Sequence, residues 1–189
     1  MNTLTLPAPV TPAEFAALCV LNRDLRLELT AQGELVIMAP AGSDGSRRNL
    51  LLILRLGVWS EQDGTGIAFE SSAGFTLPNG AVRSPDASWV RRERWSVLSQ
   101  EQQRQFAPLC PDFVVELRSP TDSLRELQRK MREYQGNGTR LGWLLDPQHQ
   151  SVEIYRPNQE VEILTAPALL TGEEVLPGFT LDPTAILAN

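Results

Sequence analysis

Residues 112–118 read Asp-Phe-Val-Val-Glu-Leu-Arg, and residues 141–145 read Leu-Gly-Trp-Leu-Leu. Both runs are short and predominantly apolar, which is typical of buried strands. Between them, apolar residues from Leu124 to Tyr134 recur with helical spacing after Ser123, a residue type that often starts helices. A strand, a helix and a second strand in this order predict an α/β fold with a mixed sheet flanked by helices.

The flanking sequence extends this unit. Its patterns predict a hairpin over 25–38, a loop over 39–48, a helix over 48–62, a strand over 81–90 paired antiparallel with one over 74–77, and a returning strand over 151–155. The chain has 189 residues, 42% of them hydrophobic, and no linker-like or low-complexity tract. Residues 1–189 are therefore expected to form a single domain.

Composition excludes several classes of function. Two distant cysteines and one histidine argue against a zinc site, and no apolar run is long enough to cross a membrane. The first ten residues lack the pattern of a secretory signal, so we expect a cytoplasmic protein with reduced cysteines. A net charge of −6 argues against loose, sequence-independent binding to nucleic acid, although it does not exclude a nuclease with a carboxylate-rich metal site.

Two carboxylates stand out because they interrupt apolar strands. Glu116 lies in the run 112–118, and Asp86 lies in the strand expected over 81–90. A buried carboxylate is costly unless it is paired or bound to metal, and Mg²⁺ is commonly held by one or two carboxylates together with substrate phosphate. Asp112 is roughly 13 Å from Glu116 along the strand, too far to share an ion. We therefore choose Asp86, from a neighbouring strand, as the partner of Glu116, and interpret Glu70 as a surface residue.

Lys130 is the only lysine, whereas sixteen basic residues are arginine. An ammonium is compact and can lie beside a metal-bound water and a phosphate where a guanidinium is too broad. By helical angle, Lys130 lies on the flank of the apolar stripe, beside Tyr134 and Glu126. Two interpretations stay open: a functional lysine beside the two carboxylates, or an ordinary exposed ion pair with Glu126, four residues earlier.

Several motifs of the sequence resemble those of a known family. Pro85-Asp86, Glu116 and a basic residue two positions later resemble the PD-(D/E)xK motif of the restriction-endonuclease-like superfamily. A wider set of motifs is similar to the Uma-type endonucleases, a large bacterial family; this set comprises Leu27-Glu-Leu29, Pro111–Asp122, Lys130-x-x-x-Tyr134, Trp143–Pro147 and Val152–Tyr155. The resemblance covers most of the chain.

The resemblance implies a restriction-endonuclease-like core and hydrolysis of DNA phosphodiester bonds with Mg²⁺ or Mn²⁺. Asp86 and Glu116 would then hold the metal, and Lys130 would replace the usual lysine of the motif, whose own position is occupied by Arg118. Glu28 matches an acidic position near the start of the family and would complete the site. One departure is that many relatives have a histidine before the second helix, where residues 43–47 of this chain contain none.

Two alternatives come from other classes of function: a binding or interaction module that keeps the nuclease fold without turnover, and a metal-dependent hydrolase of another phosphoester. The acidic charge, Arg118 in place of the lysine and the absent histidine favour the interaction module. Because two-fold dimers are common and duplex cleavage by small domains often needs two copies, we also predict a homodimer. The hairpin 25–38 and the apolar run 166–170 are the surfaces expected to form its interface.

Overall fold

The computed structural model describes residues 2–4, 8–38 and 42–188. The helices are α1 Pro12–Leu21, α2 Ser43–Asp63, α3 Arg92–Ser96, α4 Gln100–Arg104, α5 Leu124–Gly136 and α6 Thr184–Leu187. The strands are β1 Asn2–Leu4, β2 Arg26–Leu29, β3 Leu35–Met38, β4 Gly66–Glu70, β5 Phe75–Thr76, β6 Val82–Arg83, β7 Ala87–Arg91, β8 Phe113–Leu117, β9 Leu141–Asp146, β10 Ser151–Tyr155, β11 Glu162–Thr165, β12 Leu170–Thr171 and β13 Thr180–Leu181.

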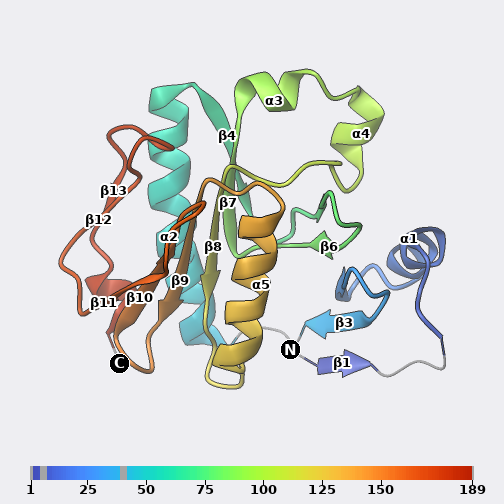
Figure 1. Cartoon of the computed structure of the whole chain (residues 1–189), viewed down its shortest axis with the longest axis horizontal. Coiled ribbons are helices and arrows are strands. Elements are labelled where there is room, and N and C mark those ends of the chain that lie inside the picture. The colour runs from blue at the N-terminus through green and yellow to red at the C-terminus, as the bar shows by residue number, and fades with distance from the viewer. Residues whose placement is uncertain (1, 5–7, 39–41, 189) are drawn as a thin grey trace.

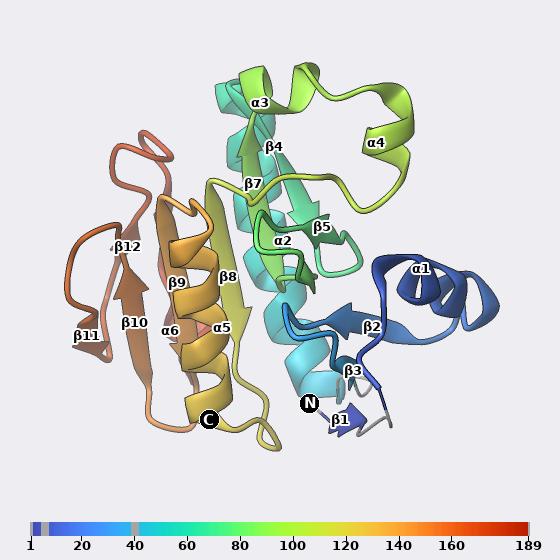
Figure 2. The same cartoon turned by 45° about the vertical axis from the view of Figure 1, so that its right-hand side comes forward.

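A six-stranded mixed sheet forms the centre of the fold, in the order β11-β10-β9-β8-β7-β4. β8 and β9 are parallel and are joined by α5, whereas the other neighbouring pairs are antiparallel. The two views show α5 on one side of this sheet and α2 on the other (Figures 1 and 2). The predicted α/β fold with a mixed sheet flanked by helices is confirmed.

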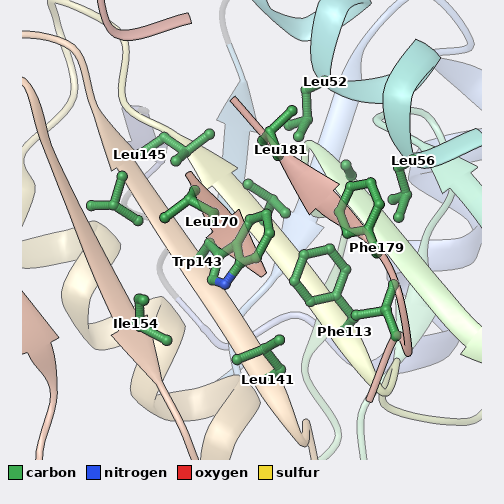
Figure 3. Close-up of a cluster of buried hydrophobic side chains, with 14 of the residues drawn as sticks. Leu52, Leu56, Phe113, Leu141, Trp143, Leu145, Ile154, Leu170, Phe179 and Leu181 are labelled. Atoms are coloured by element: carbon green, nitrogen blue, oxygen red, sulfur yellow. The ribbon is translucent and has the colours of Figure 1, made fainter. Parts of the chain in front are cut away.

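The side chains of β8 alternate between the two faces of the sheet. Phe113, Val115 and Leu117 pack in the cluster on the α2 side, which also contains Leu52 and Leu56 from α2. Figure 3 shows part of this cluster, in which Trp143 and Phe179 stack with their ring centroids 5.9 Å apart. Val114 packs in the opposite cluster with Leu127, Met131 and Tyr134 from α5. Glu116 shares the strand face of Val114 and is therefore directed toward α5.

A second sheet has five strands in the order β1-β3-β2-β6-β5. The hairpin predicted over 25–38 is present as β2 and β3, with Arg26 paired to Met38 and Leu29 to Leu35. Leu29 also pairs with Val82 of β6. This sheet brings Glu28, in the middle of β2, close to the residues that follow β6.

Two predictions about local structure are wrong. The single strand expected over 81–90 is two strands in different sheets, β6 and β7, because Pro85 lies between them and cannot donate a ladder hydrogen bond. The helix expected over 48–62 begins earlier, at Ser43, so residues 43–48 are helical rather than a loop. Burial of Arg48, whose Nη1 donates to the carbonyl oxygen of Ile186 at 2.7 Å, helps to hold that first turn. Residues 39–41 of the expected loop lie outside the described residues.

Most of the leucines on the surfaces expected to form a dimer interface are buried within the chain. Leu27, Leu29 and Leu35 of the hairpin are buried, since they pack against Phe15 of α1. In the run 166–170, Leu170 is buried as well. Within the described residues, no helix is long and apolar enough to cross a membrane.

Candidate functional site

Glu116 lies on β8, and Asp86 lies directly before the neighbouring strand β7. Ala87 pairs with Val115 in antiparallel register, so Asp86 is next to the position of Glu116, and adjacent residues in such a pair share one face of the sheet. Asp86 is half-buried, and its Oδ2 accepts a hydrogen bond of 2.8 Å from the backbone N–H of Leu117. Glu116 is buried. The structure thus brings together the two carboxylates that the sequence singled out.

Lys130 joins this pair from α5. Its ammonium Nζ lies 2.8 Å from Oε1 of Glu116 and 2.8 Å from Oε1 of Glu28. The residue is only 4% exposed. The alternative of an exposed pair with Glu126 is therefore wrong, because Glu126 contacts Arg129 instead, at 3.6 Å.

Glu28 is fully buried, and its carboxylate contacts Arg83 of β6, Ser84 and Lys130 of α5. Oε1 accepts hydrogen bonds from Lys130 and from the backbone N–H of Ser84, each at 2.8 Å, and Oε2 lies 3.2 Å from Nη1 of Arg83. Arg83 in turn donates from Nε to Glu133 of α5 at 2.6 Å. The two carboxylates of Glu28 and Glu133 therefore hold Arg83, and Glu28 holds Lys130 against Glu116.

Several residues of this cluster were missed from the sequence. Tyr134, which the helical pattern placed in the apolar core, donates its hydroxyl to Oε1 of Glu116 at 3.1 Å. Asn49 of α2 directs Nδ2 toward Oδ1 of Asp86 at 3.5 Å, and its own Oδ1 is buried without a hydrogen-bond partner among the described residues. Arg26 lies on the same face of β2 as Glu28. Its Nε is also buried without a hydrogen-bond partner among the described residues. Only Arg83 had a sequence signal, as a charged residue next to Ser84-Pro85-Asp86.

The electrostatics of the cluster favour a further cation. Burial raises the pKa of Glu116 to about 8, against the opposing charge of Lys130. Burial also raises the pKa of Asp86 above its usual range. For Glu28, burial opposes ionisation, but the charges of Lys130 and Arg83 outweigh it and lower the pKa. When all are ionised, the four carboxylates of Glu28, Asp86, Glu116 and Glu133 share three cations, Lys130, Arg83 and Arg26, which leaves one negative charge in excess.

This donor set fits a divalent cation of the Mg²⁺ type. Two carboxylates on adjacent strands supply oxygen ligands, and Mg²⁺ commonly takes its remaining ligands from water and substrate phosphate. Within residues 2–4, 8–38 and 42–188 there is no group of three or more His, Cys, Asp or Glu side chains arranged for a metal. A closed, all-protein metal cage is therefore not the kind of site present among them.

Arg118 lies away from the cluster. Its Nη1 contacts Oδ2 of Asp146 at 2.8 Å and Nδ1 of His149 at 3.2 Å, and its Nε donates to the carbonyl oxygen of Asp122 at 3.2 Å. Arg118 follows the last residue of β8, where strand alternation no longer determines the direction of its side chain. The structure thus brings together Asp86, Glu116, Lys130 and Glu28 but not Arg118.

A polar pocket of about 390 Å³ adjoins the cluster between β2, β3 and α5. Arg83 and Lys130 line it, together with Arg129 and Arg132. Three acidic residues, Glu34, Glu126 and Glu133, line it as well, so its lining is mixed in charge.

A family model described as "Uma2: Putative restriction endonuclease" matches residues 12–184. The chain belongs to the Uma2 family. A search of curated proteins found no match. Among solved structures, the Uma2 chain is similar to one described as "a putative nuclease belonging to DUF820" from Anabaena variabilis ATCC 29413, with a TM-score of 0.79 and 23% sequence identity over 95% of this chain and 98% of that chain. The likeness to that structure shows a shared fold. Residues 43–47, which contain no histidine, lie at the start of α2.

Proposed function

We propose that this Uma2 protein is an endonuclease that hydrolyses DNA phosphodiester bonds with Mg²⁺ or Mn²⁺. The observation that carries the proposal is the contact of Lys130 with Glu116, directly beside Asp86, in a cluster with more carboxylates than cations. The description of the family as a restriction endonuclease supports DNA as the substrate. We also propose that residues 1–189 form a single domain.

Each residue has a distinct proposed role. Asp86 and Glu116 would hold the metal, which when bound lowers the pKa of a water ligand and stabilises charge on the phosphate. Lys130 would orient the attacking water or neutralise the phosphate, since its ammonium is held at 2.8 Å from Glu116. Glu28 would fix Lys130 in that place through its own contact of 2.8 Å. Arg118 is excluded from these roles in the proposal, because Asp146 holds it elsewhere.

Arg26 is the proposed contact to the DNA backbone. Its guanidinium is close enough to Asp86 to oppose the rise in the pKa of that carboxyl. One of its donors, Nη2, is used by the carbonyl oxygen of Ser71, whereas Nε is buried without a partner among the described residues. Guanidinium groups bind phosphate through paired N–H donors, so a phosphodiester beside Asp86 would meet a suitable donor.

Cleavage of supercoiled plasmid and of single-stranded DNA tests the proposal. The wild type and the variants Asp86→Asn, Glu116→Gln and Glu70→Gln are compared with Mg²⁺, with Mn²⁺ and with chelator. Glu70 is the matched control, an exposed carboxylate at the end of β4. We expect metal-dependent cleavage that both site variants lose and the control retains. Equal cleavage by all four proteins would mean a contaminating nuclease and would remove the assignment.

A non-catalytic interaction module is the second candidate. It is favoured by the way Lys130 and Arg83 already neutralise Glu28 and much of Glu116 without any added ion. Such a module needs no divalent cation at Asp86 and Glu116. Metal binding therefore separates the two candidates even before a DNA substrate is found.

A further inference from the structure

The outer face of α2 is apolar where a surface helix is normally polar. Leu52 and Leu56 of this helix are buried against the central sheet. On the opposite face, Leu50, Leu54 and Val58 are 65%, 51% and 46% exposed. Residues spaced by four lie on one side of a helix, so these three form a continuous stripe. Contiguous exposed apolar surface of this kind marks a contact with another molecule.

Opposite charges flank the stripe at equal distances. Arg47 and Glu61 lie seven residues before and after Leu54, close to two full helical turns, so both share its face of the helix. Both residues are exposed. Arg47 contacts Asp44 at 3.2 Å, in a pair whose side chains are 52% and 61% exposed, and the carbonyl oxygen of Ala185 at 3.5 Å. Such a surface pair is weak, so the guanidinium can contact a second carboxylate.

This pattern is complementary to an antiparallel copy of itself. A two-fold axis at Leu54 places Leu54 against its own copy and Leu50 against Val58 of the other chain. The same axis places Arg47 opposite Glu61 at both ends. Two-fold dimers use one self-complementary patch on both chains, which is the property that this face has.

We propose that the α2 stripe, defined as Arg47, Leu50, Leu54, Val58 and Glu61, is the contact surface between two copies of this chain, packed antiparallel about Leu54. An unrelated apolar partner would need no such symmetric placement of charges about the central leucine. The stripe replaces the hairpin 25–38 and the run 166–170 as the interface, since four of their six leucines are buried within the chain; Leu25 and Leu169 are the exposed ones. The inference concerns association alone and does not depend on the proposed chemistry.

Charge reversal tests both the surface and the identity of its partner. Sedimentation equilibrium at high micromolar concentration should give a species of twice 20.9 kDa for the wild type. Arg47→Glu or Glu61→Arg alone places like charges opposite one another, and each should weaken the dimer about tenfold or more. The double variant restores opposite charges across the axis and should return to within about threefold of the wild type. Leu169→Glu, at an exposed leucine outside the stripe, should change nothing.

A cysteine placed at the axis gives an independent readout. Leu54→Cys should form a disulfide between chains on mild oxidation, whereas Val97→Cys, at a residue 81% exposed elsewhere, should not exceed the background of the wild type. Circular dichroism of each variant checks that the fold is retained. A wild type that stays monomeric, or a double charge variant as weak as the single ones, would overturn the proposal; the second result would mean that Arg47 and Glu61 do not face each other across the two chains.

Discussion

Removing the ammonium of Lys130 is the most informative perturbation of the buried cluster. In Lys130→Met the side chain keeps nearly its length and loses its charge. Two contacts of 2.8 Å disappear, one to Glu28 and one to Glu116. Because Lys130 is 4% exposed, water cannot readily replace them.

The loss of stability depends on whether Glu28 and Glu116 find another partner or a proton once the ammonium is gone. Breaking a buried ion pair by removing one partner costs about 3–5 kcal/mol. Glu116 can stay protonated near neutral pH, since its pKa is raised to about 8, and Glu28 keeps Arg83 at 3.2 Å. We therefore expect the lower end, about 3 kcal/mol, which for a chain of this size lowers the Tm by roughly 6–12 °C.

Thermal and urea unfolding followed by circular dichroism measure this loss. Arg129→Ala is the control on the same helix, because its contact to Glu126 is long and exposed, and such a pair contributes about 0–1 kcal/mol. In Lys130→Met with Glu28→Gln, the carboxylate that needs the ammonium is also gone, so the double variant should lose less than the sum of the single ones. A Lys130→Met protein as stable as Arg129→Ala would refute the reasoning.

Three further outcomes are expected. Arg118→Ala should leave cleavage within about threefold of the wild type, since Arg118 is held by Asp146 outside the site; a loss as severe as that in Glu116→Gln, measured on the same plasmid, would return Arg118 to it. Burial opposes ionisation of Asp146, but hydrogen bonds from His149 and Arg118 outweigh it and lower its pKa. Its ionised form therefore stabilises the fold above its unfolded pKa of about 3.9, and this contribution is lost as pH falls through the lower folded value. Asp146→Asn should accordingly be less stable than the wild type at neutral pH and closer to it in acid, and a difference in unfolding that is constant with pH would contradict this. Arg26→Ala should raise KM for DNA more than it lowers kcat, with Arg55→Ala as the control, and unchanged kinetics would remove Arg26 as the backbone contact.

The pairing of Asp86 with Glu116 could be predicted because it depends on local rules. Alternation along residues 112–118 fixes the face of Glu116, and a neighbouring antiparallel strand brings Asp86 to the same face. The angle of Lys130 on α5 permitted a position beside them but did not require it. Its second partner, Glu28, comes from a hairpin more than a hundred residues earlier, and no local pattern specifies that contact.

Other features were beyond local rules for identifiable reasons. Residues 43–48 contain Ser, Asp and Gly, which favour loops in isolation, but tertiary contacts such as that of Arg48 with Ile186 override this preference. Tyr134 has the spacing of a core residue and is one, while its hydroxyl also reaches Glu116. The resemblance put Arg118 at the lysine position of the motif, but Arg118 follows the end of β8 and contacts Asp146 instead.

Calorimetric titration with Mn²⁺ tests most directly whether Asp86 and Glu116 form a divalent-cation site. The protein is titrated as the wild type and as Asp86→Asn, Glu116→Gln and the surface control Glu70→Gln. We predict one binding event in the wild type and in the control. Neither site variant should show this event. Binding that persists unchanged in Asp86→Asn and Glu116→Gln, or no binding to the wild type, would contradict it.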